Sequence, residues 1–350
     1  MKRKVIFAGA KVQDGRGSLA AVEDLVARLR DAQYKIAELH IDPLAAGWYT
    51  PMKKNHFRSG ASPIEALEYA GSLIDSAAAD FVVIAGQDYL RSDYTREERK
   101  KLMDVYAGDF SIPEGYTQLA RIWIKKRGIE ATEFQEMAAL LFANYQKTAK
   151  NNQVELQIDE KWYEPVTELF RGVDCANPYV DFAAKLLIGS EDCLNLEMMK
   201  DIVPVFVLGT AVFQTSGDGK NYLEEIAKFE HVRKAYQKAC LDAGIDFKSE
   251  FLAGRAALEV YTCYPVIPLA FLMSNQFADG KKALAELLDN YEVTVTGGMN
   301  LAKAAWNNPS LNALVTMHGK ILNSNFGIGL VHGNGGLGYK QGVAILRKSL

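Results

Sequence analysis

The alternation of apolar and polar positions along the chain predicts an α/β protein. Residues 5–8 and 81–85 form short apolar runs of the kind that become buried strands. Residues 19–29 and 64–74 instead repeat apolar positions every three to four residues, as amphipathic helices do. The helix at 64–74 leads into the strand at 81–85, and strands that alternate with covering helices indicate a layered α/β fold.

The middle of the chain has a different pattern. Residues 96–150 are rich in charge and lack strand-like runs, while the apolar positions of 116–126 and 132–145 have helical spacing. We therefore predict a helical loop subdomain, at about residues 96–165, inserted into the α/β layers.

The rest of the chain repeats the first pattern. Apolar runs predict strands at 182–188, 203–212, 293–296, 328–332 and 342–346, with a helix at 222–241. Because the order of elements is repeated, we expect two similar halves, residues 1–200 and 201–350. Periodicity alone would equally permit a doubly wound sheet.

Composition narrows the class of protein. The chain has 350 residues, 49% of them apolar, with a formal charge of -3 and a pI near 6.0. It can therefore bury a large core, and it has no basic field for nucleic acid. No run approaches the roughly 18 apolar residues of a membrane span, and the first apolar run is too short for a signal peptide. We expect a cytoplasmic protein without membrane contact.

Four motifs in the last third of the chain carry a family resemblance. They are Glu-Val-Tyr-Thr-Cys-Tyr-Pro at 259–265, Thr-Val-Thr-Gly-Gly at 294–298, Asn-Asn at 307–308 and Val-His-Gly-Asn-Gly-Gly at 331–336. In this order they resemble the C-terminal half of a thiolase, of the sterol-carrier or acetyl-CoA acetyltransferase-like type. Residues 114–128 and 173–181 resemble the loop-domain helix and a strand entry of the same family, so the resemblance covers nearly the whole chain.

The resemblance implies a five-layer αβαβα fold and an unusual active site. Thiolases carry a nucleophilic cysteine in a Cys-x-x-Gly turn, and the matching turn here, at 57–60, begins with Phe57. Tyr261 stands where the family has His or Asn, and Asn312 stands at the usual oxyanion-hole histidine. His332 matches the acid/base cysteine best.

Other site residues follow from the same motifs. His56 precedes the position of the missing cysteine, where a catalytic role and a structural one are equally open. Tyr264 and Cys263 belong to the tyrosine-containing loop. We expect the substrate to be held by the remaining polar and glycine positions of the motifs: Gly297, Gly298, Asn307, Asn308, Asn312, Gly335 and Gly336.

Three functions remain open. The resemblance implies enolate chemistry at the α-carbon of a coenzyme A thioester, with no tightly bound cofactor and no metal. A retro-aldolase would use Tyr261, Tyr264 and His332 without acylating itself, and a histidine beside Tyr261 would help that tyrosine act as a base. An acyltransferase would need Cys263 or another thiol as nucleophile. The third alternative is a non-catalytic subunit of a hetero-oligomeric thiolase complex.

The family also implies partners. Thiolases are commonly homodimers, and members that lack the cysteine often work with a small subunit that contains a zinc ribbon and an OB fold. The four cysteines of this chain form no Cys-x-x-Cys pair, so they indicate neither that partner's zinc site nor disulfides.

Overall fold

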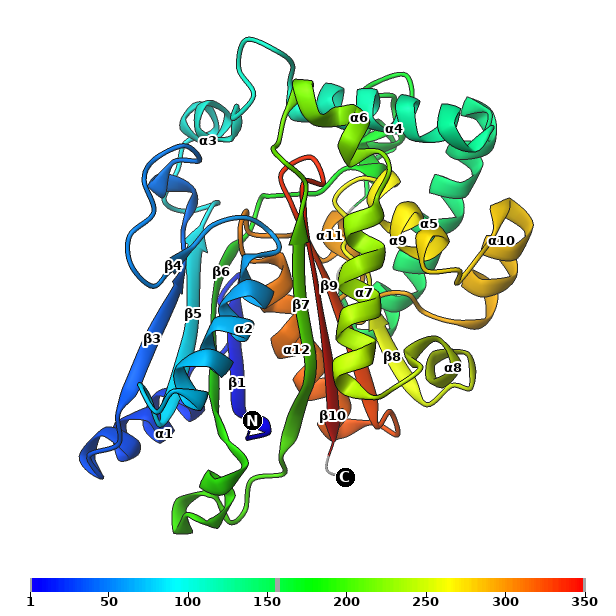
Figure 1. The fold of residues 1–350 in the computed structure, drawn as a ribbon. Helices are drawn as coiled ribbons and strands as arrows, with labels where there is room; N and C mark the ends of the chain where they lie inside the picture. The colour runs from blue at the N-terminus through cyan, green and yellow to red at the C-terminus, as the bar shows by residue number, and fades with distance from the viewer. Residues whose placement is uncertain (1, 155–157, 349–350) are drawn as a thin grey trace.

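The computed structural model describes residues 2–154 and 158–348. Its strands follow one hydrogen-bonded path in the order β4-β3-β5-β6-β1-β7-β10-β9-β8, with β2 paired to β1 (Figure 1). Their bounds are β1 Lys4–Gln13, β2 Arg16–Gly17, β3 Ile36–Ile41, β4 His56–Phe57, β5 Phe81–Tyr89, β6 Asp181–Ser190, β7 Val205–Gln214, β8 Ala256–Glu259, β9 Ile328–Gly335 and β10 Lys340–Lys348.

This continuous path has two halves of the same topology, which we call the two sheets. The order β3-β5-β6-β1 on one side repeats as β8-β9-β10-β7 on the other, and each set has one parallel pair, β3 with β5 and β8 with β9. The sheets meet where Lys4 pairs with Val207 and Ile6 with Val205. The repeated order of elements along the sequence therefore corresponds to a repeated topology.

Two helices form a buried layer between the sheets. They are α2 (Ser62–Asp75) and α12 (Pro309–Asn323), and both contact strands of both sheets. Successive residues of β1 point to opposite faces, so Ile6 packs with these central helices while Val5 and Phe7 pack with α1 (Ala20–Asp31) on the outside. On the other sheet, α7 (Glu230–Ala243) covers the outer face. The expected five layers, αβαβα, are present.

The helical subdomain lies between β5 and β6. It contains α3 (Arg96–Met103), α4 (Ile112–Arg127) and α5 (Ala131–Asn151), so both helices expected from apolar spacing are confirmed. Ser111 and Glu114 form a capping box at the start of α4, and Gly128 ends that helix in a left-handed conformation. Residues 155–157 of the expected subdomain lie outside the described residues.

Two expected elements differ from the structure. Residues 293–296 form no strand, because the backbone N–H groups of Val295 and Thr296 bond to the carboxylate of Glu259 instead of a neighbouring strand. The helix expected at 222–241 is divided into α6 (Leu223–Ile226) and α7, since Phe229 between them has φ 50°. The remaining helices are α8 (Phe247–Leu252), α9 (Val266–Ser274), α10 (Gly280–Asn290) and α11 (Gly298–Leu301).

Helix α9 is the most apolar of these helices, and it belongs to the core. Eight of its nine residues are buried, which explains why its apolar positions show no periodicity. Among residues 2–154 and 158–348, no helix combines the length and the hydropathy needed to span a membrane.

Candidate active site

A cavity of about 280 Å³ opens where the two central helices begin. Gly60, just before α2, and Asn307, just before α12, both line it. Helix N-termini carry a partial positive charge and favour negative charge on a nearby ligand oxygen. Of the described residues that line it, none is charged and six are aromatic: Trp48, Tyr106, Tyr116, Tyr261, Tyr264 and Trp306.

Asn307 ties the starts of the two helices together. Its Oδ1 accepts a hydrogen bond from the Ser59 backbone N–H at 3.1 Å, and its Nδ2 donates to the Asp42 carbonyl at 2.8 Å. Ser59 is fully buried at φ 124°, a conformation that strains a residue with a side chain. The turn that leads into α2 is therefore held in a strained shape by a side chain of the other half.

Phe57 lies away from this cavity. It belongs to β4, and its ring packs against Tyr69 with 5.9 Å between the centroids. Gly60 occupies the cavity wall instead, and a methyl group added at this position would overlap the Tyr261 hydroxyl. The absence of a side chain at residue 60 therefore makes room for the tyrosine.

Tyr261 follows β8 and is 7% exposed. Burial raises the pKa of its hydroxyl well above 10, and the nearby Cys263 adds to the effect. At neutral pH the side chain is consequently a neutral phenol that donates a proton more readily than it accepts one.

Cys263 lines the cavity with its sulfur directed at Tyr116. The thiol donates to the Tyr116 hydroxyl oxygen at 3.3 Å, and burial raises the pKa of Cys263 to about 12. A thiol with such a pKa contains almost no thiolate at neutral pH, and the thiolate is the form that attacks acyl groups. The environment of Cys263 therefore works against a role as nucleophile.

His332 lies behind Tyr261 on β9 and is 1% exposed. Its Nδ1 accepts from the Tyr261 backbone N–H at 3.3 Å, and its Nε2 lies 2.6 Å from Gln341 Oε1, so Nε2 carries the proton. Burial lowers the pKa of His332 to about 3. We expect a retro-aldolase to place a histidine beside the Tyr261 hydroxyl, but His332 contacts the Tyr261 backbone, and both of its ring nitrogens are engaged.

A chain of neutral hydrogen bonds connects His332 to the cavity. Gln341 Nε2 donates to Asn334 Oδ1 at 2.6 Å, and Asn334 Nδ2 donates to the Tyr116 hydroxyl at 3.2 Å. The Tyr116 hydroxyl in turn donates to the Gly336 carbonyl at 2.6 Å. Since each link uses an amide, an imidazole or a phenol, this network fixes the cavity wall without an ionised group.

A second cavity, of about 10 Å³, is also lined by Tyr261. Its lining includes Glu259, Asn312 and His332, and its volume suits about one water molecule. Asn312 Oδ1 accepts from Lys11 Nζ at 2.6 Å. Burial raises the pKa of Glu259 to about 7 and lowers that of Lys11 to about 8.

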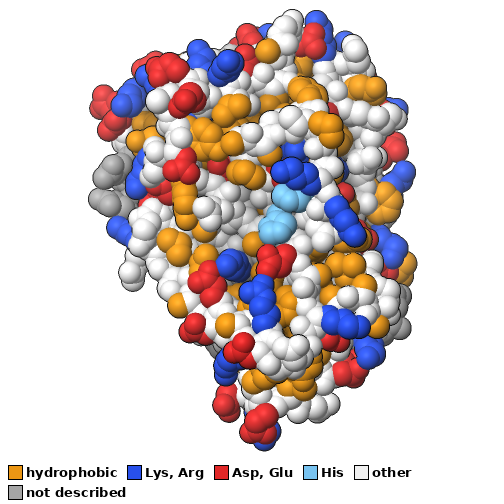
Figure 2. All heavy atoms as spheres, turned by 90° about the vertical axis from the view of Figure 1, so that its left-hand side faces the viewer, with side chains coloured by type: hydrophobic (Ala, Val, Ile, Leu, Met, Phe, Trp, Pro, Cys, Tyr) orange, Lys and Arg blue, Asp and Glu red, His pale blue; other side chains and the backbone are white. Residues whose placement is uncertain are grey.

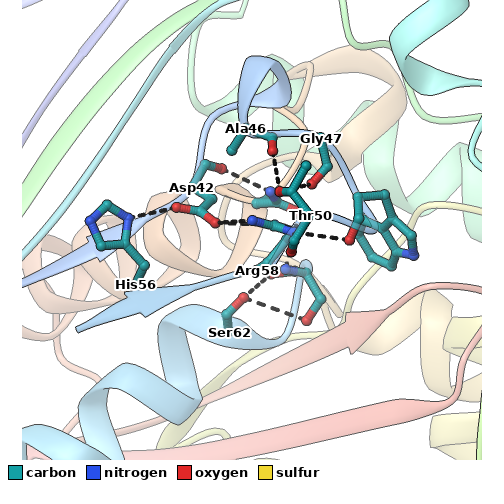
Figure 3. Close-up of polar contacts among 10 residues, drawn as sticks. Asp42, Ala46, Gly47, Thr50, His56, Arg58 and Ser62 are labelled. Carbon is teal, nitrogen blue, oxygen red and sulfur yellow. Dashed lines mark hydrogen bonds and ion pairs between the residues drawn. The ribbon is translucent and has the colours of Figure 1, made fainter. Parts of the chain in front are cut away.

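His56 belongs to a separate charged cluster on the N-terminal half. Its Nδ1 lies 2.7 Å from Asp42 Oδ1, while the other carboxylate oxygen accepts from Arg58 at 2.7 and 3.0 Å (Figure 3). His40 lies beside His56, with 5.0 Å between the ring centroids. The other three histidines are buried, so the histidine atoms at the surface in Figure 2 belong to this pair.

The structure thus divides the expected site residues. Tyr261, Cys263, Tyr264, Asn307 and Gly336 line the large cavity, and His332 and Asn312 line the small one. The remaining residues line neither of these two cavities: His56, Gly297, Gly298, Asn308 and Gly335.

The expected site residues that line neither cavity, His56 apart, are packed inside the protein. Gly297 and Gly298 pack closely on Ala149 and Tyr145 of α5, and Gly335 packs on Ser59. Asn308 is fully buried, and neither polar atom of its side chain has a hydrogen-bond partner among the described residues.

Sequence reasoning missed four lining residues that matter here: Trp48, Tyr116, Trp306 and Asn334. Asn334 lies inside the 331–336 motif between two glycines, and Tyr116 lies inside the segment that resembles the loop-domain helix. Both could therefore have been predicted from the sequence motifs. Trp48 and Trp306 lie outside these motifs, so no sequence pattern indicated them. Within residues 2–154 and 158–348, no three His, Cys, Asp or Glu side chains gather as a metal site would require.

Comparison with known proteins identifies the fold. A monomeric SCP2-thiolase-like protein type 1 from Mycobacterium smegmatis is similar with a TM-score of 0.70 and 19% identity, over 99% of this chain and 78% of its own. The Ltp2–ChsH2(DUF35) aldolase is similar with a TM-score of 0.65 and 14% identity, over 99% of this chain and 98% of its own. No family model and no curated protein matches the sequence. The chain has a thiolase-like fold.

Proposed function

We propose that this protein makes or breaks a carbon–carbon bond next to the carbonyl of a coenzyme A thioester, as an aldolase does, without acylating itself. The observation that carries the proposal is the uncharged cavity at the start of two buried helices, which has a neutral phenol in its wall. Two helix N-termini favour the negative oxygen of an enolate. The raised pKa of Cys263 speaks against the alternative in which that thiol becomes acylated.

The reaction balances with Tyr261 as the proton carrier. In the cleavage direction the β-hydroxyl group loses its proton, the bond between the α- and β-carbons breaks, and its electron pair enters the thioester enolate. The enolate then takes a proton at the α-carbon, so one proton moves from the β-oxygen to the α-carbon. We assign this transfer to Tyr261 as a relay: its hydroxyl oxygen takes the β-hydroxyl proton while its own proton passes to the α-carbon, so the phenol is protonated before and after each turnover.

A non-catalytic subunit is the second candidate, and one observation favours it. Among the described residues, no carboxylate and no imidazole lines the large cavity, so none of them supplies a general base of the usual kind to its wall. In that case the chain would support an active partner. We keep the homodimer and a zinc-ribbon/OB-fold partner as proposals for either function.

The test follows cleavage of a panel of 3-hydroxyacyl-CoA thioesters, with intact-mass spectrometry of the protein in the same samples. We expect carbonyl product, no acyl adduct, and a loss of roughly 10²- to 10⁴-fold in turnover for Tyr261→Phe. The matched control Cys263→Ala should retain turnover. An acyl adduct on any cysteine would overturn the proposal, and binding without turnover in wild-type protein would favour the subunit.

A further inference from the structure

The aromatic walls of the large cavity indicate what kind of acyl group it accepts. Resting on the function proposed above, we propose that the acyl group carries an uncharged aromatic ring, which is bound between aromatic side chains, and that straight alkyl chains are poorer ligands.

The absence of charge on the described lining residues excludes charged acyl groups. Within the described part of the chain, no residue that lines the large cavity is charged. A carboxylate or ammonium group on the acyl part would therefore enter a desolvated site without a partner of opposite charge, which is costly. The acyl group must be neutral where it meets these walls.

Two aromatic pairs supply the walls. The indoles of Trp48 and Trp306 meet edge to face, with 6.0 Å between centroids and 74° between planes. The rings of Tyr116 and Tyr264 are stacked at 4.1 Å and 18°. A flat ring gains from edge-to-face and stacked contacts with such surfaces beyond the gain from burial, and an alkyl chain does not.

The tyrosine pair is fixed in place and cannot fold into the empty space. The Tyr116 hydroxyl donates to the Gly336 carbonyl at 2.6 Å, and the ring of Tyr264 also packs on Phe170 at 5.3 Å. Because the Tyr116 hydroxyl already donates a hydrogen bond, a ligand would contact this residue through its ring. A preformed surface of this kind binds without the entropy cost of ordering its side chains.

Trp306 is held at the cavity by a strained backbone. It has φ 37°, in the left-handed region that bulky residues rarely adopt. The next residue, Asn307, makes the two hydrogen bonds that join the helix starts, and these contacts offset the strain. Strain that persists beside a cavity points to a functional use of the side chain it orients.

The cavity is large enough for a ring and the adjoining thioester. A cavity of roughly 150 Å³ holds benzene, whereas this one measures about 280 Å³. The Tyr261 hydroxyl, in the same lining, remains for the thioester and β-oxygen.

Two unreactive coenzyme A thioethers of similar apolar area test the inference: S-(3-phenylpropyl)-CoA and S-heptyl-CoA, with binding measured by calorimetry. We expect the phenyl compound to bind about 10-fold more tightly to wild-type protein. Trp306→Leu should abolish that preference. Trp162→Leu, at a partly exposed position outside the cavity lining, should retain it. Trp48→Leu replaces Trp306→Leu if circular dichroism shows that the latter is unfolded.

The outcomes separate the two proposals. Equal binding of the two thioethers, or tighter binding of the heptyl compound, would overturn the aromatic acyl group and leave the proposed reaction standing. If neither thioether binds, the site is not one for coenzyme A derivatives, and both proposals fail.

Discussion

The two histidines expected to act in the site are held in opposite ways. His56, on the N-terminal half, is partly exposed and lies against a carboxylate that also binds Arg58. His332, on the C-terminal half, is buried between an amide oxygen and a backbone N–H. In this molecule the buried ion pair lies outside the cavity lining, while the network that runs from His332 to Tyr116 in the cavity wall consists of neutral dipoles. An uncharged wall suits chemistry in which the substrate alone develops charge.

The largest effect on stability should come from breaking the charged cluster. Arg58 is 9% exposed and donates to both Asp42 and the Trp48 carbonyl. Arg58→Met leaves the buried carboxylate short of donors, and we expect it to lower the free energy of unfolding by about 3–5 kcal/mol. Urea unfolding measures this loss. Arg121→Met, which removes an exposed pair with Glu168, should cost almost nothing, and equal losses would show that the Arg58 cluster is not special.

A buried carboxylate behind the neutral wall should give the next effect. Burial raises the pKa of Glu259 from 4.5 to about 7, so its protonated form is favoured in the folded state. Its contribution to stability is full below pH 4.5 and is lost as the pH rises through about 7. Relative to Glu259→Gln, wild-type protein should lose roughly 2–3 kcal/mol between these values. Parallel stability curves for the two proteins would contradict the raised pKa.

Gln341 tests the neutral network itself. Gln341→Leu removes the partner of the His332 Nε2–H group and a donor to Asn334. Buried polar groups without partners cost about 1–3 kcal/mol, and we expect that loss in urea unfolding. The control Gln237→Leu changes an exposed glutamine on α7 and should leave stability nearly unchanged. A neutral result for Gln341→Leu would mean that water replaces the lost partner.

The sequence predicted the layers better than the site, for physical reasons. The spacing of apolar residues in β1, α2 and β5 indicates which face of each element is buried, and this spacing can be seen within a short stretch of sequence. The strand expected at 293–296 was wrong because a side chain, Glu259, bonds to backbone groups that a strand would have paired. A pattern of neighbouring residues does not predict such a contact between distant parts of the chain.

The site shows the same limit. Tyr261, Cys263 and Tyr264, which the motifs single out, line the large cavity, and they belong to a loop that follows a buried strand. The pairing of Trp48 with Trp306 joins residues that are far apart in the chain, and it depends on the strained turn before α12. Such a contact belongs to the assembled halves, and neither half alone encodes it.

The smallest loss of stability is expected for a substitution of His56 in the charged cluster. His56→Gln preserves a donor to Asp42 at a partly exposed site, so we expect less than about 1 kcal/mol of lost stability. Turnover should stay within about twofold of wild type, because His56 does not line the cavity and a catalytic group must reach the reacting atoms. Steady-state kinetics beside Tyr261→Phe decides the matter. If His56→Gln reduced turnover as strongly as Tyr261→Phe, the charged cluster would take part in the chemistry, and the division between a charged support and a neutral wall would be wrong.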